Sequence, residues 1–207
     1  MRAKLVILAA SLVLASCVSL LPKPGPDPDI FRLSEIALPD DLAASPVVMV
    51  ELPRTPKALR NNRMAVIEGK QGIAYTTGAR WAAAVPQIMA ELLGDSMLAT
   101  GRLNVVSPQE GVHPRYGLIT EIRHFEIVYD QGAEAAPLGR VTIRAKLINR
   151  RSRTVIAQRH FDAQVRASEN RLSAIAAAVD SAAHQGGRAL GAWAANQLEA
   201  AEEAAKR

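Results

Sequence analysis

The residue with the clearest chemical role is the chain's single cysteine, Cys17, which follows an apolar run at residues 5–15. This run is too short to cross a bilayer, because a spanning helix needs about 20 apolar residues. Arg2 and Lys4 precede the run and supply the positive flank of an export signal. The pattern therefore predicts a signal peptide at residues 1–16, with Cys17 as the first residue of the mature chain.

The residues just before the cysteine indicate what happens to its thiol. Leu14-Ala15-Ser16-Cys17 has the leucine and the two small residues of a bacterial lipobox. In a lipobox the cysteine sulfur is acylated and the signal is then cut, here between Ser16 and Cys17. The alternative is an ordinary secretory signal with a cysteine nearby by chance. We favour the lipobox, which makes Cys17 the lipid-attachment site and gives the chain a membrane anchor.

The remaining polar residues form no recognisable catalytic or metal-binding pattern. The histidines are far apart in the sequence, and lipidation of Cys17 would leave no thiol for a metal site or a disulfide. The sequence contains no nucleophile motif, phosphate loop or dinucleotide fingerprint. It thus predicts neither an enzyme nor a metal or other cofactor. The histidines are His113, His124, His160 and His184.

The net charge of +5 does not indicate a nucleic-acid-binding protein. The basic residues are scattered, and no basic run alternates with aromatic residues as a nucleic-acid surface requires. The densest basic cluster, at residues 150–153, falls in a predicted turn, and we interpret it as a solvated loop. Export would also separate the chain from nucleic acid, so this class of partner is excluded.

Composition divides the mature chain into a spacer and a folded part. Residues 18–29 contain four prolines and a glycine with no apolar period. Residues 17–29 are therefore predicted to be a lipidated cysteine and a semi-rigid tether, which would reach roughly 30–40 Å. Residues 30–207 are long enough to bury one core and are predicted to form a single domain.

Apolar periodicity predicts an α+β domain in which a mostly antiparallel sheet carries one mid-chain helix and a long C-terminal amphipathic helix packed on it. The mid-chain helix is expected at residues 85–99, after a turn at residues 80–84. The C-terminal helix is expected to begin near an N-cap at Ser168. A tight turn at residues 69–72 should close a hairpin. The expected strands cover residues 31–33, 47–52, 63–68, 73–77, 103–107, 117–129, 141–149 and 154–166.

The last two of these strands should form a long antiparallel hairpin with one buried face. Arg144 and Lys146 are expected on its exposed face. Gly186 and Gly187 interrupt the pattern of the C-terminal helix and mark either a bend or a close contact of the helix with the sheet. The residues expected on the buried face of the hairpin are Val141, Ile143, Ala145 and Leu147.

Beyond these patterns, the sequence resembles the ABC-type transport auxiliary lipoproteins, the family that includes paraquat-inducible protein C and the YmbA-like lipoproteins. The resemblance begins with the lipobox and the proline-rich tether. It is most specific over PRTPKALRNNRMAVIEGKQGIAYTTGARWAAAVPQIMAELL. The chain departs from the family pattern at Phe31, where tyrosine is common, and in its extension past Leu198. The matching positions in the specific stretch are Arg63, Tyr75, Trp81 and Pro86.

The resemblance implies an outer-membrane-anchored periplasmic accessory lipoprotein of an MCE-type ABC lipid transport system. Such a protein would dock the MCE substrate-binding protein for phospholipid transport between the two membranes. Val18 after the cysteine is consistent with outer-membrane sorting in this family. Two other functions stay open, namely a periplasmic lipid carrier with an apolar cavity between sheet and helices, and a scaffold lipoprotein for envelope assembly.

The implied partners are an MCE-domain protein of an ABC lipid transporter and a membrane, contacted through the N-terminal lipid. Exposed strand edges would also allow further copies of the chain to associate. Tyr75 and Trp81 are the candidate residues of the partner surface. The alternative is that these two side chains anchor the mid-chain helix to the sheet.

Overall fold

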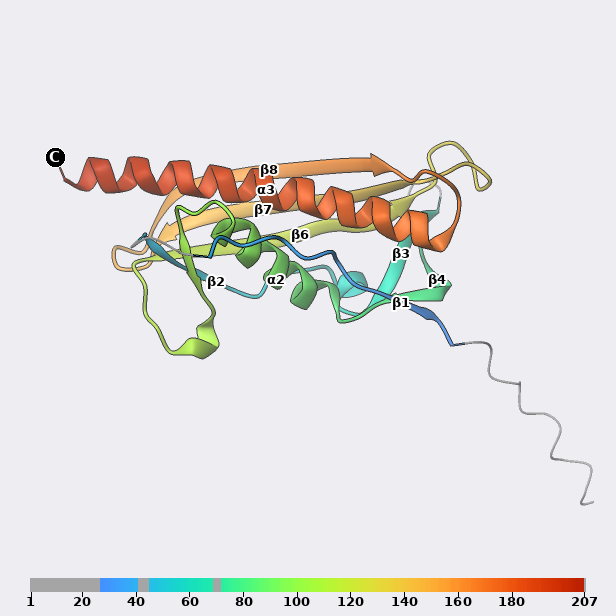
Figure 1. Ribbon diagram of the computed structural model, residues 1–207, viewed down its shortest axis with the longest axis horizontal. Helices are drawn as coiled ribbons and strands as arrows, with labels where there is room; N and C mark the ends of the chain where they lie inside the picture. The colour runs from blue at the N-terminus through green and yellow to red at the C-terminus, as the bar shows by residue number, and fades with distance from the viewer. Residues whose placement is uncertain (1–26, 41–44, 69–71, 207) are drawn as a thin grey trace, which may run out of the picture.

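The computed structural model describes residues 27–40, 45–68 and 72–206 (Figure 1). Cys17, the signal peptide, most of the tether and residues 69–71 of the turn predicted at 69–72 lie outside the described residues. The elements in chain order are β1 (Asp29–Phe31), β2 (Val47–Val50), η2 (Lys57–Leu59), β3 (Arg63–Glu68), β4 (Gly72–Trp81), α2 (Val85–Leu98), β5 (Asn104–Val106), η3 (Pro108–Glu110), β6 (Tyr116–Val128), β7 (Leu138–Asn149), β8 (Thr154–Arg166) and α3 (Leu172–Ala205).

The described strands form one eight-stranded sheet whose central member is β6. β7 pairs antiparallel with one edge of β6 along its whole length, and β8 continues the sheet beyond β7. The other edge of β6 is shared, since β2 pairs with residues 116–118 and β3 with residues 126–128. Between these two stretches, Arg54 forms an isolated bridge to Glu121. β5 extends the sheet beyond β2, and β4 and β1 extend it beyond β3.

The prediction of a mostly antiparallel sheet is wrong, because the sheet is mixed. Four of the seven pairings between described strands are parallel, namely β1 with β4, β2 with β5, β2 with β6 and β3 with β6. The pairings β3–β4, β6–β7 and β7–β8 are antiparallel. Parallel neighbours need long crossover connections, and here α2 and the long loops supply them. Apolar alternation reports which face of a strand is buried and carries no information on the direction of its neighbour.

Several element predictions are confirmed. β3 has the predicted bounds, and α2 begins at the predicted Val85 with Pro86 in its first turn, where a proline is tolerated. β7 and β8 form the predicted hairpin, with Arg144 and Lys146 exposed. The four side chains predicted for its buried face are at most 1% exposed.

Several predicted boundaries differ from the structure: the strand expected at residues 31–33 is β1 at Asp29–Phe31, and β7 begins at Leu138, three residues earlier than expected. Two further differences have a clear structural context. The strand at residues 73–77 runs on to Trp81, because β1 pairs in parallel with residues 79–81 and holds them extended where a turn was predicted. The C-terminal helix begins at Leu172 with Arg171 as its N-cap, not near Ser168. There the chain is tied to the β6–β7 loop, since the Ala167 amide donates to the Pro137 carbonyl oxygen at 2.9 Å.

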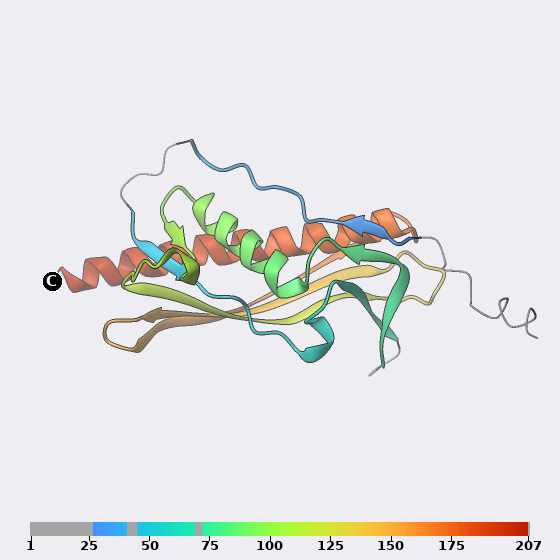
Figure 2. The ribbon, with the colours of Figure 1, turned by 90° about the horizontal axis from the view of Figure 1, so that it is seen from below.

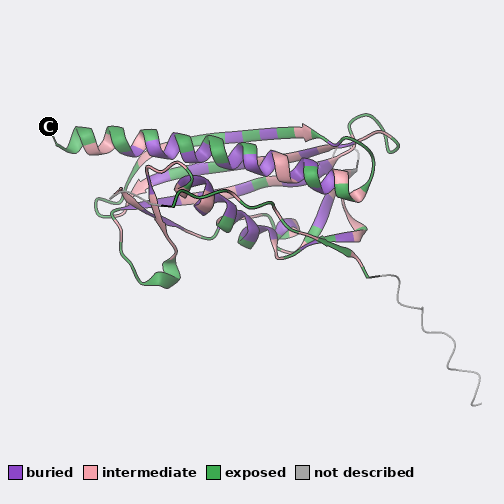
Figure 3. Cartoon of the chain, in the orientation of Figure 1, coloured by how far each residue is buried: buried purple, intermediate pink, exposed green. Residues whose placement is uncertain are grey.

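Both helices cover the same face of the sheet and leave the opposite face open (Figure 2). α3 lies on β7 and β8, and α2 lies beside it (Figure 1). Buried residues alternate with exposed ones along β7 and follow one side of α3 (Figure 3). The core therefore fills the space between one sheet face and the two helices.

Glycines bring α3 into contact with its neighbours. A Cβ on Gly139 of β7 would lie 2.5 Å from the Val179 backbone nitrogen, and one on Gly191 would meet the Ser96 carbonyl oxygen of α2. A Cβ on Gly186 would lie 3.2 Å from Ile143 Cδ1. Of the two predicted roles for the glycine pair in this helix, the close contact with the sheet is the one observed at Gly186.

We expect Gly191→Ala to destabilise the protein by about 1–3 kcal/mol, because the new methyl group would press on backbone atoms that cannot move aside. This cost should exceed the gain of up to about 1 kcal/mol that alanine brings to a helix interior. The matched control is Gly94→Ala in α2, whose methyl group would lie at an ordinary 3.6 Å from Val105 Cγ1. Gly94→Ala should leave stability equal or higher. Urea denaturation measures both variants, and a Gly191→Ala protein as stable as Gly94→Ala would contradict the close contact.

Candidate functional site

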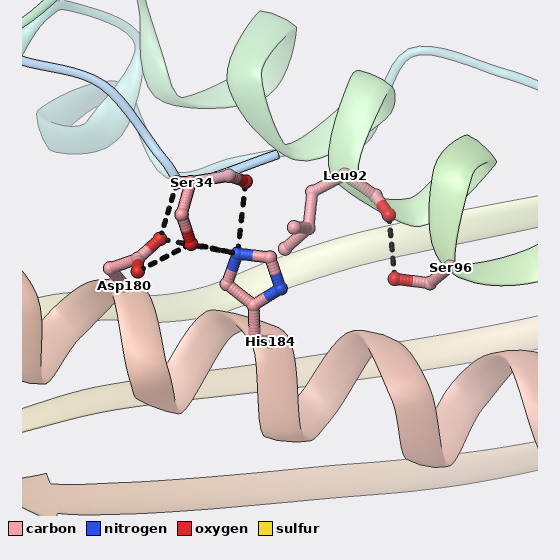
Figure 4. Close-up of polar contacts among 5 residues, drawn as sticks. All are labelled: Ser34, Leu92, Ser96, Asp180 and His184. Carbon is pink, nitrogen blue, oxygen red and sulfur yellow. Dashed lines mark hydrogen bonds and ion pairs between the residues drawn. The ribbon is translucent and has the colours of Figure 1, made fainter. Parts of the chain in front are cut away.

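Three residues of the types found in hydrolytic enzymes meet where the N-terminal segment crosses α3, and we call them the Ser34 clasp. Ser34 follows β1, while Asp180 and His184 are one turn apart on α3. The Ser34 amide donates to Asp180 Oδ1 and the Ser34 hydroxyl donates to Asp180 Oδ2, both at 2.8 Å (Figure 4). His184 Nε2 lies 2.9 Å from Ser34 Oγ and 3.1 Å from the Ser34 carbonyl oxygen.

The geometry of the clasp differs from that of a catalytic triad. In a triad the histidine uses one ring nitrogen for the serine and the other for the aspartate. Here the same atom, His184 Nε2, faces Ser34 and also lies 3.2 Å from Asp180 Oδ1. A carbonyl oxygen and a carboxylate can only accept, so Nε2 carries a hydrogen and cannot take the serine proton. The clasp is built to fasten the N-terminal segment to α3.

The N-terminal segment is held at a second place by the sheet. β1 pairs in parallel with residues 79–81 of β4, and the Ala82 amide donates to the Phe31 carbonyl oxygen at 2.7 Å. The segment that leads to the tether is therefore attached both to the sheet and to the longest helix.

The predicted partner-surface residues both lie on β4 and are engaged in packing. Trp81 is 2% exposed and meets Phe125 edge-on, with ring centroids 5.2 Å apart. Tyr75 is half-buried, its hydroxyl donates to the Ala58 carbonyl oxygen at 2.9 Å, and the Arg63 guanidinium lies 4.0 Å from its ring centroid. These contacts join β4 to η2 and to the central strand. A role of either residue in binding a partner stays a prediction.

The open face of the sheet carries cross-strand rows of polar side chains over β6, β7 and β8. We call this surface the polar sheet face. Its members project away from the helices, because their neighbours in each strand form the buried face. The register places in successive rows Ile119, Lys146 and Gln158; Glu121, Arg144 and His160; His124, Thr142 and Asp162; and Glu126, Arg140 and Gln164.

Neighbouring side chains stabilise the ionised form of two carboxylates on the polar sheet face. The hydrogen bond from Arg123 at 2.9 Å, together with Arg144 at 3.6 Å, lowers the pKa of Glu121. A hydrogen bond from Thr142 does the same for the pKa of Asp162. Both carboxylates are therefore ionised at neutral pH. A pocket of about 390 Å³ on this face is lined by charged side chains of Arg54, Glu121, Arg144 and Lys146, among others.

Two more features of the described residues concern metal binding and membrane crossing. No group of three or more histidine, cysteine or acidic side chains there is arranged to hold a metal ion. No helix within residues 27–40, 45–68 and 72–206 has the length and apolar character needed to cross a membrane.

Sequence reasoning proposed Cys17, Tyr75 and Trp81, whose roles stay predictions, and it did not identify the clasp or the polar sheet face. Asp180 and His184 could be recognised as neighbours on a helix, but nothing in the sequence pairs them with Ser34. The polar sheet face did leave a signal, because neither alternating face of residues 117–129 is wholly apolar.

The chain matches the family model described as "ABC-type transport auxiliary lipoprotein component" over residues 34–190. No curated protein matches it. Among solved structures, XCC0632 from Xanthomonas campestris, of family DUF330, is 20% identical with a TM-score of 0.75, and the alignment covers 84% of this chain and 99% of that one. CT253 from Chlamydia trachomatis is 10% identical with a TM-score of 0.50, over 75% of this chain and 98% of its own. At these sequence identities the two similarities show a shared fold and nothing more.

We expect Asp180→Ala to release the N-terminal segment from α3, because two hydrogen bonds to Ser34 are lost. A loss of about 1–2 kcal/mol would raise the population of the locally open form roughly 5–30-fold. Trypsin cleavage after Arg32, whose side chain is 77% exposed, should accelerate by a similar factor. The control is Glu203→Ala, an exposed position on the same helix. Equal cleavage rates in the two variants, read by mass spectrometry, would show that the clasp does not hold the segment.

Proposed function

Because the chain belongs to the family of ABC-type transport auxiliary lipoprotein components, we propose that it is the outer-membrane-anchored accessory of an MCE-type ABC system that moves phospholipid between two membranes. In this proposal acyl chains on Cys17 hold the domain at the periplasmic face of the outer membrane. The tether ahead of β1 acts as the spacer, and the domain docks the MCE substrate-binding protein.

The observation that carries this proposal is the double attachment of the N-terminal segment. A tethered domain experiences any pulling force at the residues where the tether joins it. Here that junction is fixed by β1 in the sheet and by the Ser34 clasp on α3. Load on the tether would therefore pass to the whole domain and would not peel off one strand.

We place the docking surface on the polar sheet face. The helices α2 and α3 cover the other face of the sheet and not this one (Figure 2). The strand register holds its charges in fixed positions, and all of them except the buried Glu126 are at least partly exposed. Fixed charges contribute mainly to the specificity and rate of association. Tyr75 remains a candidate contact on β4, and the outer edge of β8 is where copies of the chain could pair.

The packing favours docking over direct lipid carriage. A carrier needs room for acyl chains between sheet and helices. At Gly139 the backbones of β7 and α3 instead come so close that a methyl group would collide with them. A scaffold without a transporter would use the same anchor, and only the identity of the partner separates it from the docking proposal.

We expect Cys17→Ser to abolish the envelope barrier function while the domain stays folded, because serine cannot take the thioether-linked lipid. Ser16→Ala is the matched control, since it keeps a small residue before the cysteine and should leave function intact. Detergent sensitivity of the producing cells measures the barrier function, and circular dichroism of the two purified chains measures whether the domain is folded. A Cys17→Ser strain with an intact barrier would contradict anchoring as the essential role.

We expect Lys146→Glu on the polar sheet face to weaken co-purification with the MCE-domain protein at least about tenfold, since like charges opposed at an interface repel. Lys146 forms no ion pair within the described part of the chain, so its reversal should not disturb the fold. Arg188→Glu makes the same charge change on an exposed position of α3 and should bind as the original chain does. If both variants lose the partner equally, or neither does, docking does not use the polar sheet face.

A further inference from the structure

The β7–β8 turn and the start of β6 lie at the end of the molecule opposite β1, beside the C-terminal part of α3 (Figure 1). Cationic side chains of these two segments line one pocket. This pocket has a volume of about 550 Å³, and we call it the arginine pocket. The pocket is lined by His113, Pro114, Arg115, Arg150 and Arg151. Three guanidinium groups and one imidazole thus come from two segments far apart in the sequence.

Backbone hydrogen bonds bring these two segments together. The Arg150 amide donates to the Arg115 carbonyl oxygen at 2.7 Å, which places the two arginines side by side. The turn that follows is set by Asn149, whose Oδ1 accepts from the amides of Arg151 at 3.0 Å and Ser152 at 3.2 Å. The positions of Arg150 and Arg151 are therefore fixed by the hairpin and are not those of a free loop.

A glycine makes room for the Arg150 side chain. A Cβ on Gly117, the one glycine of β6, would lie 3.0 Å from Arg150 Cδ and 3.3 Å from Arg150 Cγ. The stem of Arg150 therefore lies flat across the strand, which orients its guanidinium group. Any larger residue at position 117 would push the stem away.

The positive charges of the pocket are only partly balanced by acidic side chains of the described residues. Arg115 forms an ion pair with Glu202 at 3.4 Å. Glu202 also accepts a hydrogen bond from Tyr116, and burial together with that bond raises the pKa of Tyr116 to about 12, so the phenol stays a donor. Arg150 and Arg151 have no acidic partner among the described residues. Guanidinium groups held together without a counter-charge repel each other, and an anion would remove that cost.

We propose that the arginine pocket binds a phosphate group, and that this phosphate belongs to a phospholipid headgroup. A carboxylate presents its two oxygens in one plane, whereas a tetrahedral phosphate presents oxygens in several directions and can accept from arginines placed around it. The pocket volume lies in the range of small-molecule sites and exceeds what a bare phosphate fills. Phosphate binding is inferred from the geometry of the pocket alone. The choice of a lipid as the source of the phosphate rests on the proposed function.

The experiment uses the acylated mature chain held in phosphatidylcholine nanodiscs and titrates it with soluble probes that have no acyl chains. The probes are glycerophosphoglycerol, the headgroup of an anionic phospholipid, and inorganic phosphate. Nuclear magnetic resonance of the arginine Nε–Hε groups reports which side chains respond. We expect the headgroup to bind at least threefold more tightly than inorganic phosphate, with shifts in Arg115, Arg150 and Arg151.

Variants separate a built pocket from general surface charge. Arg150→Ala with Arg151→Ala should weaken headgroup binding at least tenfold. The control, Arg80→Ala with Arg188→Ala, removes the same charge from exposed positions elsewhere and should bind as before. Arg150→Lys keeps the charge but loses the two parallel N–H donors of the guanidinium, so this variant should bind the headgroup several-fold more weakly. Gly117→Ala should weaken binding by displacing the Arg150 stem.

Each other outcome overturns a defined part of the proposal. Equal loss in the control pair, or full binding by Arg150→Lys, would mean attraction by charge alone. Tighter binding of inorganic phosphate would contradict a lipid source, and tighter binding of an acidic peptide would assign the pocket to a protein partner. Absence of any response would remove the pocket as a site. A chain that binds the headgroup but does not co-purify with an MCE-domain protein would keep the pocket and contradict the docking proposal.

Discussion

The close contact of α3 with the sheet and with α2 is the constraint on which the rest of the fold depends. A side chain at Gly139 or Gly191 would hold the backbones apart, so glycines stand at these points of closest approach, and alanines make up much of the buried side of α3. This accounts for a chain in which aromatic residues make up 4% of the sequence. Two edge-on aromatic pairs fill the wider parts of the core, Trp81 with Phe125 and Phe161 with Trp193.

Because α3 is fixed so closely, it connects the two ends of the domain. Its 34 residues span about 50 Å at a rise of about 1.5 Å per residue. Its first half carries the acceptors that hold Ser34 and the N-terminal segment. Its last turns carry Glu199 and Glu202, which bind Arg102 and Arg115 beside the arginine pocket. One rigid element thus links the side where the N-terminal segment joins the domain to the opposite, basic end.

Sequence patterns predicted those parts of the fold that depend on local burial. The period of the residues in α2 and the alternation in the β7–β8 hairpin each follow from one buried face, and both were predicted close to their observed bounds. Strand direction was not predictable, because β2 and β3 reach β6 only through long connections whose course no local pattern encodes. The extension of β4 past Gly78 depends on β1, which comes from a distant part of the chain. For the same reason the Ser34 clasp was missed, as its partners are about 150 residues apart.

The account rests on a folded domain held at a membrane through the sulfur of residue 17. The most direct measurement is the intact mass of the chain extracted from its native membranes. The account predicts one species with the mass of residues 17–207 plus a diacylglyceryl group and an N-linked fatty acid. A free thiol at Cys17, or a chain that still carries residues 1–16, would contradict it.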